Sequence, residues 1–204
     1  MGIARVWMRI SVGLVLFGLL TGTPVLRAGG PMEGIRETTG RILQILSDPS
    51  LEGKEHRAER RRRIREAVDE RFDWEAIARS ALSTQWRNLK PAEKDEFTRL
   101  FSSLVERTYM DRLEAYSGED VVYLDEETFD TRAKVRVKIV TRKNQEIPVE
   151  YRLRRGNGEW RVYDILIEGV SLVKNYRVQF NDILAKSSYA ELVERLKAKV
   201  QQES

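Results

Sequence analysis

The chain contains no cysteine and only one histidine, His56, among its 204 residues. The absence of cysteine excludes disulfides, thiolate metal sites, a cysteine nucleophile and the cysteine-linked anchor of a lipoprotein. A single histidine argues strongly against a histidine-based metal centre or catalytic triad. Chemistry that depends on thiols or imidazoles is therefore not expected.

The chain also has little net charge outside its first residues, although the whole sequence has a pI near 9.3. Arg5, Arg9 and Arg27 are the only charged residues among the first 28. Without them the number of Lys and Arg falls from 36 to 33, against 32 Asp and Glu. A nearly neutral body argues against a dedicated nucleic-acid-binding protein.

The sequence has no apolar run long enough to suggest a full membrane span. Residues 10–20 form a run of about 11 apolar residues, whereas a spanning helix needs ~20. Residues 1–28 are therefore predicted to be a secretory signal peptide cleaved after Ala28, with residues 29–204 as one exported domain. Leu26 is unfavourable near that cleavage position, so an uncleaved anchor is the alternative.

Apolar residues at intervals of three and four predict helices over 31–48, 74–82, 91–116 and 172–186, followed by a terminal helix after Ser188. Asp73 and Ser171 are suited to cap two of these helices, and Pro91 opens the longest at its favoured first position.

A highly charged segment, 52–71, contains four consecutive arginines, Arg60–Arg63. The favoured interpretation is a solvated helix with ion pairs between successive turns. The alternative is a docking face for an acidic partner or for anionic lipid headgroups.

From residue 121 the apolar period changes to two. Four strands are predicted over 121–124, 132–139, 147–154 and 160–167, and the short turns between them indicate an antiparallel meander. One face of this sheet is apolar, and helices 91–116 and 172–186 are expected to lie across it. The fold class is therefore α+β. The opposite face is basic: Lys134, Arg136, Lys138, Arg152 and Arg154.

The most distinctive stretch joins the last strand to a helix through a sharp turn at Glu168-Gly169. Both faces of this strand are apolar, which predicts a central strand. The stretch reads Trp160-x-Val162-x-Asp164-Ile165-x-Ile167-Glu168-Gly169-Val170-Ser171-x-Val173-x-Asn175-Tyr176-Arg177-x-x-Phe180. This pattern resembles the MlaC family, also called the toluene-tolerance auxiliary family. Weaker matches lie upstream at Phe72-Asp73, Trp86, Phe97, Phe101 and Tyr109.

The resemblance implies a curved four-stranded antiparallel sheet wrapped by helices around an apolar cavity, similar to the nuclear-transport-factor cone. It implies a periplasmic phospholipid carrier in the Mla pathway, which maintains outer-membrane lipid asymmetry. Its implied partners are an outer-membrane lipoprotein complex and an inner-membrane ABC-transporter complex. The acyl chains would lie inside and the headgroup at the mouth, with weak headgroup specificity. Such a carrier needs a dry pocket but no catalytic residue, metal or cofactor.

The candidate lipid-binding residues are the inward apolar positions of the sheet and of two helices. They are Phe101, Val105, Tyr109, Val135, Val137, Ile139, Val149, Tyr151, Val170, Val173 and Tyr176. Val170 is included because the strand-to-helix corner is expected at the cavity rim. Ordinary core packing is the alternative for each.

Two other functions are open on the sequence alone. Cone-shaped folds also house enzymes that use carboxylates, and Asp164 in the buried strand is the better candidate. Asp125, Glu126 and Glu127 are clustered, but we expect them in a solvated turn. A docking adaptor without a ligand would instead use the Arg60–Arg63 segment.

Overall fold

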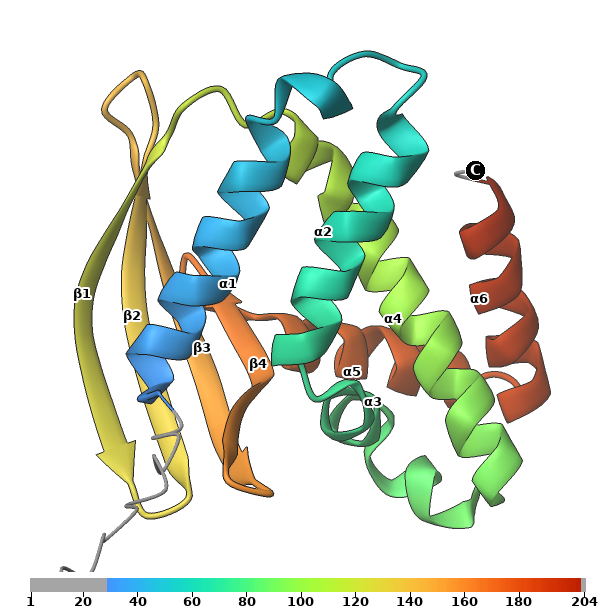
Figure 1. Cartoon of the computed structure of the whole chain (residues 1–204). Coiled ribbons are helices and arrows are strands. Elements are labelled where there is room, and N and C mark those ends of the chain that lie inside the picture. Colours follow the sequence, from blue (N-terminus) through green and yellow to red (C-terminus); the bar gives the residue numbers. More distant parts are fainter. Residues whose placement is uncertain (1–28, 203–204) are drawn as a thin grey trace, which may run out of the picture.

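A five-stranded antiparallel sheet and six α-helices make up the part of the chain that the structure describes, which confirms the predicted α+β class (Figure 1). The computed structural model describes residues 29–202, so the predicted signal peptide lies outside it. The helices are α1 (Pro31–Leu46), η1 (Pro49–Leu51), α2 (Arg57–Arg71), α3 (Trp74–Leu82), η2 (Ser83–Asn88), α4 (Pro91–Glu114), α5 (Leu172–Leu184) and α6 (Tyr189–Gln202). The strands are β1 (Asp120–Phe129), β2 (Arg132–Val140), β3 (Glu146–Gly156), β4 (Glu159–Ile167) and β5 (Val170–Ser171).

Two helices, α3 and α5, begin at residues whose side chains cap them. The Asp73 carboxylate accepts a hydrogen bond of 3.0 Å from the Ala76 backbone N–H at the start of α3. The Ser171 hydroxyl accepts one of 3.0 Å from the Lys174 N–H at the start of α5. These bonds satisfy amides that have no partner within the helix itself. The local sequence thus sets the point at which α3 and α5 start.

The corner between β4 and α5 contains a fifth strand, β5, which was not predicted from the sequence. Glu168 and Gly169 both have positive φ, 50° and 79°, which is the geometry of a two-residue hairpin turn. The chain therefore reverses, and Val170 pairs with Ile167 in β5. The sheet order is β1-β2-β3-β4-β5, so the meander is confirmed, with five strands rather than four. β4 lies between β3 and β5 and is therefore not an edge strand, as predicted, although β5 pairs only with its last two residues, Leu166 and Ile167.

β1 is longer than predicted and includes the acids expected in a turn. Asp125 and Glu127 accept hydrogen bonds from Arg136 Nη1 at 2.6 and 2.8 Å across the outer face of the sheet. The period-two apolar pattern is absent from this part of β1, because its acidic side chains pair with Arg136 of β2 on the outer face of the sheet. A register shift between Tyr123 and Asp125 marks a bulge, which bends the strand.

Two separate hydrophobic cores support the fold. One lies on the inner face of the sheet near the β1–β2 and β3–β4 turns, where Ile35 of α1 packs with Val135 and Leu153. The other joins α3, α4, α5 and α6 around Phe97 and Phe180. α1 lies against β1 and β2, and α5 lies against β4, which agrees with the prediction for the 172–186 helix; the predicted position of α4 across the sheet is wrong, because α4 packs mainly on α3 and α6. The remaining half of the inner sheet face is left without a packed helical layer.

Candidate functional site

An apolar cavity of about 490 Å³ lies between the sheet and helices α1, α2 and α4. This volume falls within the usual range for pockets that bind small molecules. Most of the lining side chains are aliphatic or aromatic. They include Ile35, Ile42, Leu43, Leu46, Ile64, Val68, Val105, Tyr109, Met110, Leu113, Val121, Val137, Ile139, Ile147, Val149, Tyr151, Ile165 and Ile167.

The sheet wall of the cavity follows from strand alternation. Successive side chains of a strand point to opposite faces. Alternate residues therefore reach the cavity from one end of each strand: Val137 and Ile139 of β2, and Ile147, Val149 and Tyr151 of β3. Ile139 and Ile147 lie opposite each other in neighbouring strands and are only half-buried. Their exposed surface faces the cavity because no helical side chain fills it.

The opposite walls are helical. Ile35, Ile42 and Leu46 recur along one face of α1, and Val105 and Tyr109 lie one turn apart on α4. The same apolar periodicity of α1 was visible in the sequence, but periodicity alone does not distinguish a helix face that borders a cavity from one that borders a packed core.

Polar groups in the lining are held by partners at the cavity margin. Arg65 of α2 forms an ion pair with Glu106 of α4. The Arg71 guanidinium donates to the Thr38 hydroxyl at 3.1 Å and to the Trp160 carbonyl at 3.2 Å, which ties α2 to α1 and β4. These groups border the apolar surface without adding an unpaired charge to it.

Tyr151 places one hydroxyl in the cavity wall. Burial, together with the neighbouring Tyr123, raises the pKa of Tyr151 to about 12. Because the cost of burial falls on the charged form, the hydroxyl stays protonated and neutral at physiological pH. The cavity surface thus remains uncharged at this position.

Six of the predicted lipid-binding residues line the cavity. They are Val105, Tyr109, Val137, Ile139, Val149 and Tyr151. Their contact with a lipid stays a prediction.

The other five predicted residues lie elsewhere. Phe101, Val173 and Tyr176 are packed in the helical core, where the Phe101 and Tyr176 rings are 4.9 Å apart between centroids. Val135 is fully buried beneath α1 in the sheet core. Val170 is 62% exposed, because the hairpin at residues 168–169 directs it away from the cavity that it was expected to border.

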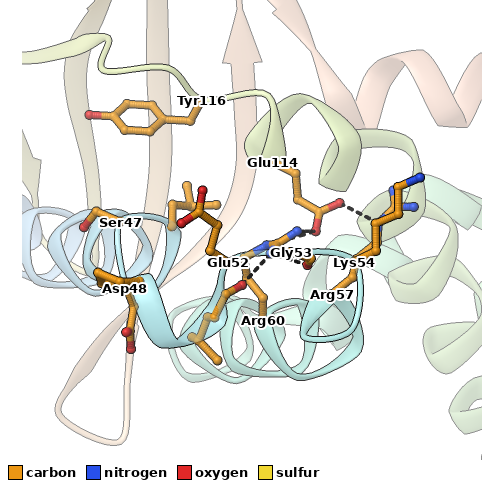
Figure 2. A pocket seen from close by; sticks show the side chains of 12 residues that line it. Ser47, Asp48, Glu52, Gly53, Lys54, Arg57, Arg60, Glu114 and Tyr116 are labelled. Atoms are coloured by element: carbon orange, nitrogen blue, oxygen red, sulfur yellow. Dashed lines mark hydrogen bonds and ion pairs between the residues drawn. The ribbon is translucent and has the colours of Figure 1, made fainter.

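A second, polar cleft of about 680 Å³ adjoins the cavity (Figure 2). Leu46 and Tyr116 line both spaces, so the two are neighbours. The cleft is formed by the end of α1, by η1 and the turn after it, and by the facing ends of α2 and α4. Gly53 has a φ of 91°, a conformation that favours glycine in the turn between η1 and α2.

At one side of this cleft Glu114 is surrounded by arginines of α2, as Figure 2 shows for two of them. Its carboxylate accepts hydrogen bonds from Arg57 at 3.2 Å, Arg60 at 2.9 Å and Arg61 at 2.6 Å. The predicted arginine-rich helix is therefore confirmed, but these three arginines bind α4 and are not simply solvated. Arg62 and Arg63 pair with Glu59 one turn away, as predicted.

Asp164, the carboxylate considered for catalysis, has structural partners. It is 6% exposed and accepts hydrogen bonds from the Ser171 hydroxyl at 2.8 Å and from the Val173 N–H at 3.1 Å. Arg152 lies 3.6 Å away. These contacts fasten the start of α5 to β4, and Asp164 is not part of the cavity lining.

Within residues 29–202, no helix is both long and apolar enough to cross a membrane. The same residues contain no group of three or more His, Cys, Asp or Glu placed to hold a metal ion.

The fold and the cavity define a class: an α+β protein with an antiparallel sheet and an apolar cavity enclosed against helices. The chain belongs to the MlaC family, because the model of the MlaC protein family matches residues 36–198.

Individual relatives are distant in sequence. The toluene tolerance protein ttg2D of Pseudomonas putida is 23% identical over 180 residues, covering 87% of this chain and 82% of the relative. The intermembrane phospholipid transport system binding protein MlaC of Haemophilus influenzae is 23% identical over 126 residues, covering 59% of each protein. A phospholipid-binding protein from Ralstonia solanacearum, solved in complex with a phospholipid, matches with a TM-score of 0.75 and 24% identity over 86% of this chain and 99% of that one. The last comparison establishes the shared fold.

Proposed function

We propose that the protein is a phospholipid carrier that holds acyl chains in the apolar cavity. The observation that carries this proposal is the cavity of about 490 Å³ lined mainly by aliphatic and aromatic side chains from the sheet and from helices α1, α2 and α4. Membership of the MlaC family supports it, as does the phospholipid bound by the structural relative from Ralstonia solanacearum.

The energetics explain why such a protein would need a cavity and no reactive group. Each acyl methylene exposed to water costs about 0.8 kcal/mol. A two-chain phospholipid with roughly 30 methylenes would therefore face a barrier on the order of 20 kcal/mol to cross water unaided. An apolar cavity removes that cost by contact alone, without a metal, a nucleophile or a cofactor.

The cellular setting is part of the same proposal. Residues 1–28 would direct export, and residues 29–204 would act in the periplasm. The carrier would move lipid between an outer-membrane lipoprotein complex and an inner-membrane ABC-transporter complex. It would in this way maintain outer-membrane lipid asymmetry. The name of the Haemophilus influenzae relative supports the transport role.

Native mass spectrometry tests lipid carriage directly. The full chain is produced in a Gram-negative host, and the exported protein is purified without detergent. We expect an added mass that matches phospholipid and that solvent extraction recovers. A protein that carries no lipid and takes none up from phospholipid vesicles would overturn the proposal.

A further inference from the structure

The sheet wall of the apolar cavity carries a single side-chain hydroxyl. The strand residues that line the cavity are all aliphatic except Tyr151 of β3, a strand that lies between β2 and β4 (Figure 1). Side chains two positions apart in a strand point to the same face, so Tyr151 shares the inner face of β3 with Val149. The Tyr151 side chain is therefore directed toward the space in which acyl chains would lie.

The Tyr151 hydroxyl has no partner within the described fold. The residues directly opposite Tyr151 in the two neighbouring strands, Val135 and Ile165, are both aliphatic. The hydroxyl forms no hydrogen bond with any residue among 29–202. A buried hydroxyl without a partner is unfavourable, because it has given up hydrogen bonds to water and gained none in return. An acceptor supplied by a ligand would remove that cost.

The hydroxyl oxygen is open to the cavity. Tyr151 is half-buried as a whole. Within the described part of the chain, every fully enclosed side-chain nitrogen or oxygen of a residue that is not exposed has a hydrogen-bond partner. Because the Tyr151 hydroxyl has none, its oxygen is not fully enclosed and keeps accessible surface. On the inner face of the sheet that surface belongs to the cavity, so a molecule in the cavity can reach it.

The chemistry of this position favours an uncharged acceptor. Burial, with a smaller contribution from Tyr123, raises the pKa of Tyr151 to about 12, so the hydroxyl keeps its proton and can donate a hydrogen bond. A phosphate would bring a full charge among aliphatic side chains, which is costly without a paired cation. A neutral carbonyl oxygen would accept the hydrogen bond without that cost.

A phospholipid has one kind of neutral carbonyl next to its acyl chains, the esters that join the chains to glycerol. On the basis of the proposed function, we propose that Tyr151 donates a hydrogen bond to an ester carbonyl of the bound phospholipid. A polar group placed in an apolar pocket fixes the orientation of its ligand. The bond would hold the glycerol end of the chains beside β3 and make the cavity select ester-linked over ether-linked lipids, since an ether linkage lacks the carbonyl.

Competition between ester-linked and ether-linked lipids tests this assignment. The exported protein is equilibrated with vesicles that contain equal amounts of diester and diether phosphatidylglycerol of the same chain length, and bound lipid is extracted and quantified by mass spectrometry. We expect the unaltered protein to be enriched in the diester lipid. Tyr151→Phe should lower the diester-to-diether ratio about fivefold, the effect of one hydrogen bond. Phenylalanine keeps the ring, and the hydroxyl has no contact to lose within the fold, so this variant is expected to stay folded.

Tyr123→Phe is the matched control. Tyr123 of β1 does not line the cavity, and its ring lies 4.0 Å from the Arg36 guanidinium, a contact that phenylalanine retains. It should keep the ratio of the unaltered protein. An unchanged ratio in Tyr151→Phe, including an equal loss of both lipids, would refute the ester contact and leave lipid carriage intact. Failure of the unaltered protein to take up either lipid would overturn both proposals.

Infrared spectroscopy observes the proposed bond itself. The protein is loaded with diester phosphatidylglycerol that carries ¹³C at its ester carbonyls, because a carbonyl that accepts a hydrogen bond absorbs at lower frequency than a free one. We expect a low-frequency carbonyl band in the unaltered protein and in Tyr123→Phe that is absent from Tyr151→Phe. The same band in all three proteins would contradict the ester contact.

Discussion

At the scale of single residues, many charged side chains form ion pairs and hydrogen bonds that connect different helices and strands. Burial alone would raise the pKa of Glu114, but hydrogen bonds from Arg61, Arg60 and Arg57 outweigh it and lower that pKa below 4.5. A carboxyl whose pKa is lower in the folded state stabilises the fold above its unfolded pKa. That contribution is present above about pH 4.5 and is lost as the pH falls through the lower, folded value.

Glu114→Gln should therefore destabilise the protein by about 2 kcal/mol at neutral pH, because three arginines lose a shared, largely buried partner. Chemical denaturation at pH 7 and at pH 3 measures the difference, which should shrink at the lower pH. Glu66→Gln is the control, since Glu66 forms an exposed pair with Arg62 and should cost less than about 0.5 kcal/mol. Equal effects of the two substitutions would contradict this account.

Asp164 provides a second test at this scale. If its carboxylate is structural, substitution of Asp164 should lower the stability of the fold. Asp164→Ala should lower stability by about 2 kcal/mol, because the Val173 N–H and the Ser171 hydroxyl lose a buried acceptor. Asp164→Asn keeps an acceptor oxygen and should cost less than half of that. Thermal unfolding of both variants decides the matter, and equal destabilisation by the two would show that hydrogen-bond acceptance is not what the fold requires.

At the scale of elements, sequence patterns predicted where helices start better than they predicted which helix packs against which part of the sheet. Capping by Asp73 and Ser171 depends on residues three positions away, so local sequence suffices. Which helix covers the sheet depends on contacts between distant segments, and the α1 stripe has the same periodicity whether it faces a core or a cavity. For this reason the sheet half of the cavity wall was largely predicted and the α1 and α2 half was missed.

The seam between α2 and α4 borders the cavity and depends on ion pairs, of which Arg65–Glu106 lies in the lining itself. Glu106→Arg should place like charges there, loosen the seam and accelerate lipid exchange severalfold. Exchange of a fluorescent phospholipid between the protein and vesicles measures the rate. The swapped pair Arg65→Glu with Glu106→Arg should restore the original rate, and a swap that stays fast would show that the pair does not hold the seam.

At the scale of the whole molecule, the division into two cores explains how a folded protein keeps an apolar space. The sheet core forms beneath α1 near the strand turns, and the helical core forms around Phe97. Each is packed on its own, so the other half of the inner sheet face can remain uncovered without loss of the fold. The separation of the two cores thus leaves room for the apolar cavity between the sheet and the helices.

The central claim is that this cavity holds acyl chains, and one matched pair of variants tests it most directly. Ile139→Trp adds bulk inside the cavity from a half-buried position of β2. Val122→Trp adds the same group on β1, where Val122 is 38% exposed and does not line the cavity. Bound phospholipid per protein is measured after purification without detergent, with circular dichroism as the check on folding. The account predicts that Ile139→Trp loses most of its lipid while Val122→Trp keeps it. Equal lipid content in two folded variants would contradict it.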